Sequence, residues 1–279
     1  MSVRLDRTAP IAVFDSGVGG LTVLHECLVS LPHEDFVYFG DTARFPYGDR
    51  TTDQLRSFAL EVADHLVAHG AKALVVACNS ATSAALPDLE QAYGRHMPVV
   101  TVVRPESRLA AAVTRNGRIG LLATSATVAS GAYERALAAA APDARLHAVA
   151  CPDLTPLIQE GREIDERVVE LVDEYCAPLV AEGVDTVILG CTHYPLVRPI
   201  IQRALGRGAQ LISSGQAIAE DLAADLAGAG LANDGGRRGS YRFLCSGDTQ
   251  AFAQLATRFL QLPLGPVSQV DVATAVRAA

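Results

Sequence analysis

The chain of 279 residues contains no tryptophan, and only 5% of its residues are aromatic and 19% charged. Because 49% of the residues are hydrophobic, the composition excludes an intrinsically disordered chain, which combines low hydrophobicity with high charge. No apolar run approaches the roughly 20 residues of a membrane-spanning helix, and the first residues lack the apolar segment of a secretory signal. We therefore expect a globular, cytoplasmic protein with no membrane contact.

Lysine is almost absent, since Lys72 is the only one and the other basic residues are arginines. The net charge is -8 and the sequence shows no basic stripe, which argues against nucleic acid as the main partner. A pyridoxal phosphate enzyme holds its cofactor on a lysine. Lys72, however, begins an apolar run, whereas ligands of parallel sheets bind at the opposite, carboxyl ends of the strands. The sequence therefore predicts a protein that uses no cofactor.

The usual metal-binding patterns are missing from the sequence as well. It has no Cys-x-x-Cys pair. The segment HLVAH (65–69) places two histidines on one helix face, but it lacks the glutamate of the HExxH motif, which favours simple exposure to solvent. We therefore expect no metal, and we expect the six cysteines to be reduced in the cytoplasm.

The sequence does contain a regular alternation of short apolar runs and Ala/Leu-rich helical stretches. Several runs are apolar throughout, which is typical of strands covered on both faces. One helical stretch, 51–70, begins with capping residues and ends at a glycine. This alternation predicts an α/β fold with mainly parallel sheets flanked by helices. We expect strands at 11–15, 36–41, 73–78, 98–103, 118–124, 145–150, 186–191, 210–214 and 241–247.

Two segments, ALVVACNSAT (73–82) and DTVILGCTHYPL (185–196), resemble each other. In each, a buried-strand pattern runs directly into a cysteine, Cys78 or Cys191, and polar residues follow. Neighbouring hydroxyl and amide donors, with the N–H groups of a following helix, can lower the pKa of a thiol. We therefore expect both cysteines to be reactive, and we expect two related halves that supply one cysteine each.

Two reactive thiols leave three chemistries open. A disulfide requires a close approach that a sequence does not reveal. A metal site would use Cys191 and His193 as neighbouring ligands. In the third chemistry, one thiolate removes a proton from a carbon and the other thiol returns a proton from the far side, which inverts a stereocentre. The remaining cysteines fit the ordinary behaviour of a small buried hydrophobe; they are Cys27, Cys151, Cys176 and Cys245.

Two further segments carry candidate site residues. DSGVGGLTVL (15–24) lacks the third glycine of a dinucleotide loop and the GK[ST] of a P-loop, so we interpret it as a tight strand-to-helix turn. Asp15 at the end of the strand is a candidate to hold a proton or a substrate ammonium group. In YFGDTARFPYG (38–48), the backbone and the Tyr47 ring could form a wall of a small pocket.

Together, five segments resemble the cofactor-independent aspartate/glutamate racemase family, and within it the glutamate racemases. They are IAVFDSGVGGLTVL, YFGDTARFPYG, VVACNSAT, ILGCTHYPL and FLCSGDTQAFAQLATRFL, in this order between residues 11 and 260. The resemblance implies racemisation of L-glutamate to D-glutamate by two-base thiol chemistry, without a cofactor, to supply peptidoglycan synthesis.

The resemblance also implies residue roles. Cys78 and Cys191 are the catalytic thiols, Asp15 lies near the first, and His193 assists the second. By analogy, Cys78 deprotonates the D enantiomer and Cys191 the L enantiomer. The residues expected to bind substrate are Asp15, Ser16, Tyr47, Gly48, Asn79, Ser80, Thr192 and His193.

The family fold has two similar α/β domains with the active site in the cleft between them. We expect residues 1–103 and 213–279 to form the first domain, with Asp15, Tyr47 and Cys78, and residues 104–212 the second, with Cys191 and His193. The resemblance further implies a homodimer, and since some members inhibit DNA gyrase, an interaction with gyrase is an additional expectation.

The sequence departs from the family pattern at two places. Gln159 stands where many members have a glutamate that supports the histidine, so either the adjacent Glu160 replaces it or the support is missing. Arg104 stands where many members have an acidic or neutral residue. Three other functions stay open: an aspartate racemase, a non-catalytic relative that binds an amino acid or a protein, and a cysteine hydrolase using Cys191 and His193.

Overall fold

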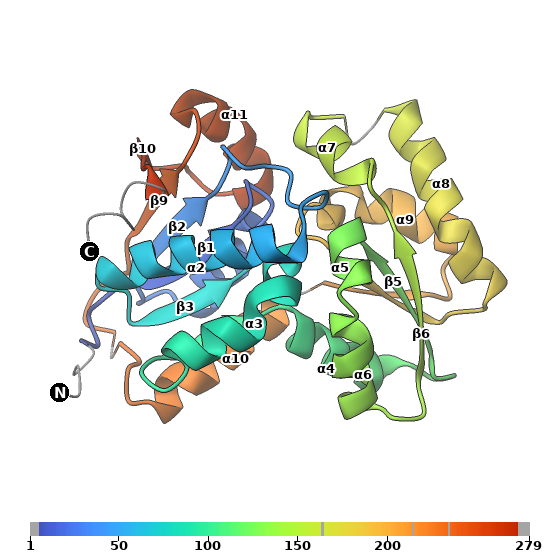
Figure 1. Cartoon of the computed structure of the whole chain (residues 1–279), viewed down its shortest axis with the longest axis horizontal. Coiled ribbons are helices and arrows are strands. Elements are labelled where there is room, and N and C mark those ends of the chain that lie inside the picture. Colours follow the sequence, from blue (N-terminus) through green and yellow to red (C-terminus); the bar gives the residue numbers. More distant parts are fainter. Residues whose placement is uncertain (1–5, 163–164, 214, 234, 273–279) are drawn as a thin grey trace.

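Two parallel sheets, each covered by helices, lie side by side in the protein (Figure 1). The structure is a computed structural model that describes residues 6–162, 165–213, 215–233 and 235–272. Within these ranges, no helix has both the length and the apolar character needed to cross a membrane.

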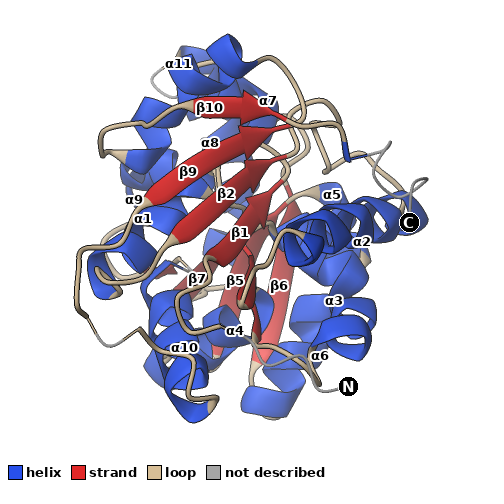
Figure 2. Ribbon diagram, turned by 90° about the vertical axis from the view of Figure 1, so that its left-hand side faces the viewer, coloured by secondary structure: helices blue, strands red, loops and turns tan. Residues whose placement is uncertain are grey.

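The larger sheet has the strand order β10-β9-β2-β1-β3-β4, and all its neighbouring strands run parallel. Figure 2 shows β10, β9, β2 and β1 next to one another in this order. The strands are β1 (Ile11–Asp15), β2 (Phe36–Gly40), β3 (Ala73–Val76), β4 (Val99–Thr101), β9 (Tyr241–Cys245) and β10 (Val267–Gln269).

The smaller sheet has the order β6-β5-β7-β8 and is also parallel throughout. Its strands are β5 (Arg118–Ala123), β6 (Arg145–Ala150), β7 (Thr186–Gly190) and β8 (Gln210–Ile212). In both sheets, four successive strands of the chain lie in the spatial order second, first, third, fourth. Strand β7 is therefore the equivalent of β3, and the cysteines that follow these two strands occupy equivalent places.

Helices connect the strands and cover both sheets. They are α1 (Leu21–Ser30), α2 (Thr52–Ala68), α3 (Asn79–Tyr93), α4 (Val103–Val113), α5 (Ser125–Ala129), α6 (Ala132–Ala140), α7 (Leu154–Gln159), α8 (Glu166–Ala181), the 3-10 helix η1 (Tyr194–Val197), α9 (Arg198–Leu205), α10 (Gly215–Gly228) and α11 (Thr249–Leu260). Helix α2 begins with the expected cap, because the Thr51 side chain accepts from the Gln54 N–H and the Gln54 side chain accepts from the Thr51 N–H.

Strand β1 shows why the strand segments are apolar throughout. Ile11 and Val13 pack into a cluster that includes residues of α1 and α10, whereas Ala12 and Phe14 pack on the opposite face with residues of α2 and α3. Since successive side chains of a strand point to opposite faces, a strand covered on both sides needs apolar residues at every position.

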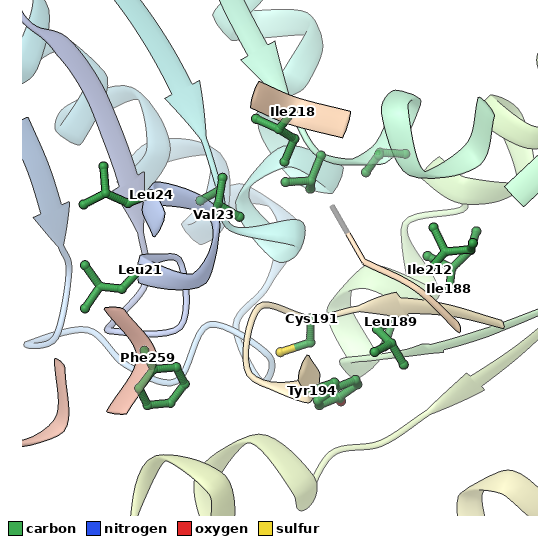
Figure 3. Close-up of a cluster of buried hydrophobic side chains, with 14 of the residues drawn as sticks. Leu21, Val23, Leu24, Ile188, Leu189, Cys191, Tyr194, Ile212, Ile218 and Phe259 are labelled. Atoms are coloured by element: carbon green, nitrogen blue, oxygen red, sulfur yellow. The ribbon is translucent and has the colours of Figure 1, made fainter. Parts of the chain in front are cut away.

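The first of these clusters continues from the larger sheet into the smaller one. It contains Leu21 and Leu24 of α1 together with Leu189 of β7 and Tyr194. Figure 3 shows Cys191 near Leu189 and Tyr194 in this cluster. One buried cluster therefore joins the two sheets next to the strand ends that carry the cysteines.

The α/β fold with parallel sheets and flanking helices is confirmed, and each expected strand is present. The strands expected at 11–15 and 145–150 have the expected bounds, and the other seven are one to three residues shorter than expected. Strand β10 was not expected, because its three residues, VSQ, carry no apolar pattern. Residue 214, the end of the expected strand 210–214, lies outside the described residues, as do residues 1–5, 163–164, 234 and 273–279 of the expected domains. The domain boundaries stay a prediction.

Candidate active site

One small cavity lies where strands of both sheets end. Residues that follow β1, β3, β5 and β7 line it, so side chains from the two halves face the same space. Every site residue expected from the sequence, except Asp15, belongs to this lining: Ser16, Tyr47, Gly48, Cys78, Asn79, Ser80, Cys191, Thr192 and His193.

Cys78 is the N-cap residue of helix α3 and is buried. Its Sγ accepts a hydrogen bond from the Ala81 N–H at 3.5 Å and donates to Ser16 Oγ at 3.7 Å. The N-terminus of a helix favours negative charge, so the thiolate of Cys78 would face the end of α3 that stabilises it.

Cys191 has a different set of neighbours. Thr155 Oγ1 lies 3.4 Å from its Sγ, and the Nδ1 atom of His193 lies 3.9 Å from it. His193 is buried, with its ring near Phe45 of the first half and Phe259 of α11. Two aromatic rings of the first half therefore lie against the imidazole that the second half places beside this thiol.

Gln159 supports the histidine directly. Its Oε1 lies 2.7 Å from His193 Nε2, while Glu160 is exposed. Both alternatives expected from the sequence, support by Glu160 or no support, are therefore wrong, because the neutral amide of Gln159 makes the contact itself. With Nε2–H donating to the amide oxygen, Nδ1 is the unprotonated nitrogen and faces Cys191.

Asp15 lies behind the cavity rather than on its wall. The carboxylate is fully buried, its Oδ2 accepts from the Gly17 N–H at 3.0 Å, and its Oδ1 accepts from Thr192 Oγ1 at 3.4 Å. Burial raises the pKa of Asp15 despite these hydrogen bonds. Since the charge of Asp15 raises the pKa of both Cys78 and Cys191, it lies near both thiols and not only near the first.

The expected lowering of the thiol pKa is wrong. Burial raises the pKa of Cys78 to about 12, and the charge of Asp15 adds to this, while the Ala81 N–H and Ser16 lower it. Burial likewise raises the pKa of Cys191 to about 12, against the lowering effect of Thr155. The sequence pattern identified the donors but not the enclosure of the strand ends, and the loss of solvation outweighs the hydrogen bonds.

Tyr47 reaches the cavity from a loop that a buried carboxylate holds in place. Its hydroxyl donates to Asp41 Oδ2, which also accepts from Arg44 Nε at 2.6 Å. Arg44 further pairs with Glu61 of α2 at 2.6 Å, and Asp41 Oδ1 accepts from Ser246 at 2.7 Å. These contacts fix the loop that brings Phe45 and Gly48 to the cavity wall.

Several lining residues were not among the predicted site residues, including Phe45, Thr124 and Thr155. Thr124 Oγ1 lies 2.9 Å from Ser80 Oγ, which joins the two halves across the cavity. Thr124 is the last residue of the expected strand 118–124 and directly follows β5, and this position at a strand end was the available signal. Thr155 lies in the first turn of the short helix α7. No local sequence pattern indicates that this helix approaches Cys191.

Elsewhere, the described residues contain no group of three or more His, Cys, Asp or Glu side chains that could hold a metal ion. Cys27, Cys151, Cys176 and Cys245 are buried and do not line the cavity. Lys72 is buried at the start of β3, paired with Glu34 at 2.5 Å, which agrees with a structural role for the single lysine.

The chain is similar in sequence and in structure to amino-acid racemases. The sequence model of the Asp/Glu/hydantoin racemases matches residues 23–222. A glutamate racemase of Beutenbergia cavernae is 50% identical over 262 residues, covering 90% of this chain and 89% of that protein. Among solved structures, a glutamate racemase of Bacillus anthracis has a TM-score of 0.90 at 38% identity, covering 95% of this chain and 98% of that one. A glutamate racemase of Francisella tularensis in complex with D-glutamate has a TM-score of 0.90 at 29% identity, covering 96% and 99%.

Proposed function

The chain belongs to the Asp/Glu/hydantoin racemase family and is an amino-acid racemase, and we propose that it interconverts L- and D-glutamate by proton transfer between two thiols. The observation that carries this proposal is the presence of Cys78 and Cys191 on one cavity, each supplied by the equivalent strand of a different sheet. The D-glutamate complex of the Francisella tularensis relative supports glutamate as the substrate.

In the proposed reaction, one cysteine acts as thiolate and the other as thiol. The thiolate takes the α-proton, the carbon keeps the electron pair, and the thiol gives its proton to the opposite side of the carbon. The protein then holds the same number of protons on exchanged sulfurs, so the two thiols titrate as one coupled pair.

A thiolate in this cavity must be stabilised by other groups, because burial raises the pKa of both thiols to about 12. The α-ammonium group of a bound amino acid brings a positive charge beside the sulfurs, which favours the thiolate form. For Cys191, burial lowers the pKa of the neighbouring His193, but a thiolate 3.9 Å from Nδ1 would stabilise the protonated imidazole, so Nδ1 can accept the thiol proton when the two charges form together. For Cys78, the Ala81 N–H at the start of α3 stabilises the thiolate.

The carbanion that forms also needs stabilisation. Ser16 and Ser80 line the cavity, and their hydroxyl groups can donate to the carboxylates of glutamate. A closed, largely water-free site strengthens each of these hydrogen bonds.

The first test is optical. Purified protein is incubated with D-glutamate or D-aspartate, with a chelator and without added cofactor, and the circular dichroism signal is followed. Decay of the glutamate signal alone supports the proposal, and decay of the aspartate signal alone identifies an aspartate racemase. No decay with either substrate would contradict racemisation of these amino acids and favour a non-catalytic binding role.

A cysteine hydrolase using Cys191 and His193 is a second candidate, favoured by the 3.9 Å approach of these side chains. A hydrolase mechanism of this kind does not use Cys78. A hydrolase would keep its activity in Cys78→Ser, whereas a two-thiol racemase would lose it.

The wider role also belongs to this proposal. D-glutamate made in the cytoplasm would supply peptidoglycan synthesis, and depletion of the protein would then be rescued by added D-glutamate. A homodimer and a contact with DNA gyrase stay predictions of the resemblance, which light scattering and a supercoiling assay with purified gyrase would check.

A further inference from the structure

A buried carboxylate that the proposed chemistry does not use lies behind Asn79. Glu106 of helix α4 is fully buried, and carboxylates are rarely buried without specific partners. Its Oε2 accepts hydrogen bonds from Asn79 Nδ2 at 3.2 Å and from the hydroxyl of Tyr133. Tyr133, fully buried on α6, in turn accepts from Asn79 Nδ2 at 2.7 Å. These three side chains form a triangle that joins α3, α4 and α6.

The triangle determines which end of the Asn79 amide faces which neighbour. Both Nδ2 protons are used, one for Glu106 and one for Tyr133. A carboxylate only accepts hydrogen bonds, so a flipped amide would place Oδ1 against the Glu106 oxygen and lose that bond. The Tyr133 hydroxyl could bond the flipped amide only by giving up its own donation to Glu106. Glu106 therefore fixes the orientation of the amide.

The other end of the amide is an acceptor without a donor. Asn79 lines the cavity, its Oδ1 is buried, and no group among the described residues donates to it. A buried carbonyl oxygen left in this way costs free energy that a ligand donor would remove.

We propose that Glu106, together with Tyr133, is a positioning residue that presents Asn79 Oδ1 to the α-ammonium group of the amino-acid substrate. The ammonium group offers three N–H donors and no acceptor, which matches this oxygen and would be repelled by a flipped Nδ2 group. The inference rests on the proposed function for the identity of the amino acid.

A double-mutant cycle tests the proposal. Binding of D-glutamate is measured by calorimetry for the wild-type protein, Glu106→Ala, Asn79→Ala and the double variant. Racemisation of the ligand adds no heat, because enantiomers have equal enthalpy. Binding is measured rather than turnover because the charge of Glu106 also raises the pKa of Cys191.

Each single variant is expected to weaken binding roughly tenfold, the size of one hydrogen bond to a charged group. The double variant is expected to bind no more weakly than Asn79→Ala, because Glu106 acts through Asn79. Glu106→Gln keeps the side-chain volume and one acceptor oxygen, so it guards against a folding defect and is expected to fall between wild type and Glu106→Ala. Unchanged affinity in Glu106→Ala, or losses that add in the double variant, would overturn the proposal.

Binding of glutarate, which carries two carboxylates and no ammonium group, distinguishes loss of the ammonium contact from a general defect in ligand binding. Its affinity is expected to stay unchanged in Glu106→Ala. An equal loss for glutarate and D-glutamate would mean that Glu106 only maintains the shape of the cavity.

Hydrogen exchange distinguishes a failure of this inference from a failure of the proposed function. The side-chain amide protons of Asn79, followed by ¹⁵N NMR, are expected to be protected in the wild-type protein and to lose protection in Glu106→Ala. This holds even if glutamate proves to be neither bound nor racemised. Unprotected amide protons in the wild-type protein would overturn the positioning role whatever the substrate.

Discussion

The two halves of the protein place a cysteine after equivalent strands, β3 and β7, but give it different surroundings. Cys78 caps a helix of 15 residues, and its sulfur accepts from a backbone N–H. Cys191 is followed by a 3-10 turn of four residues and has His193 and Thr155 as side-chain neighbours. One thiol is therefore assisted by the backbone at a helix start, and the other by an imidazole.

This difference explains how two thiols with similarly raised pKa values can take opposite roles. A helix N-terminus stabilises a thiolate but accepts no proton. An imidazole can accept and return a proton. Substitutions of the residues around Cys191 should therefore change how this thiol loses and regains its proton. Substitution of Cys78 should remove only the thiol itself.

Replacing either cysteine is expected to have the largest effect. Cys78→Ser and Cys191→Ser should each lower racemisation by about 10³-fold or more, because a hydroxyl is a far weaker acid and base partner than a thiol. The decay of the circular dichroism signal of D-glutamate measures this loss.

Cys245→Ser is the matched control, since Cys245 is buried, lies off the cavity and can keep its hydrogen bond to the Gly247 carbonyl as serine. It should retain the wild-type rate. A fully active Cys78→Ser variant would contradict the claim that each half supplies one catalytic thiol.

His193→Asn is expected to lower kcat/KM by roughly 10²-fold, because Cys191 loses its proton acceptor. The fall must be the same in both directions, since the enantiomers have equal free energy. The asymmetry appears instead in the primary isotope effect with α-deuterated substrate, which should increase most for L-glutamate if Cys191 removes its proton. His33→Asn, at a surface turn, should change neither quantity. Equal isotope effects for both enantiomers would contradict an action of His193 on Cys191 alone.

His193 should also leave a signature in stability. Burial, and then the charge of Arg258, lowers its pKa to about 3, so the folded protein holds it neutral while the unfolded chain protonates it near pH 6.5. Its stabilising contribution is therefore complete above pH 6.5 and is lost as the pH falls toward 3, by up to about 4 kcal/mol. Denaturant unfolding across this range should show a steeper loss in the wild-type protein than in His193→Asn. Identical slopes would mean that the imidazole is not held neutral.

Gln159→Glu is expected to have the smallest effect on the maximal rate but a clear one on pH dependence. A carboxylate in place of the amide, 2.7 Å from Nε2, would raise the pKa of His193 by about one to three units. Since protonated His193 cannot accept a proton from Cys191, the acidic limb of the kcat/KM profile should move to higher pH. Glu160→Gln changes the charge of an exposed neighbour and should leave the profile in place. An unmoved limb in Gln159→Glu would show that Gln159 does not control the imidazole.

Much of this site could be predicted from the sequence, because its residues directly follow apolar strands. The carboxyl ends of parallel strands meet at one edge, so Cys78 and Cys191 had to lie near the ligand if their strands were parallel. The spatial order of the strands, identical in both halves, needed the structure. So did the contact between Gln159 and His193, which depends on how helix α7 packs and not on a local pattern.

The degree of burial could not be predicted either. Asn, Ser and Thr after a cysteine indicate donors, but they do not indicate whether solvent reaches the sulfur. Asp15 shows the same limit, because its position at a strand end suggests the cavity wall, whereas its side chain turns into the protein. Glu106 belongs to no motif, and the role proposed for it rests on its hydrogen bonds with Asn79 and Tyr133, which the sequence does not reveal.

The central claim, proton transfer between two thiols from different halves, is tested most directly by NMR in D2O. L-glutamate is added, and deuterium at the α-carbon is followed separately in substrate and product during the first part of the reaction. Two thiols predict that the D-glutamate formed carries deuterium while the remaining L-glutamate keeps its proton. Deuterium entering the L-glutamate pool as fast as the product would mean that a single group both removes and returns the proton, and would contradict the account.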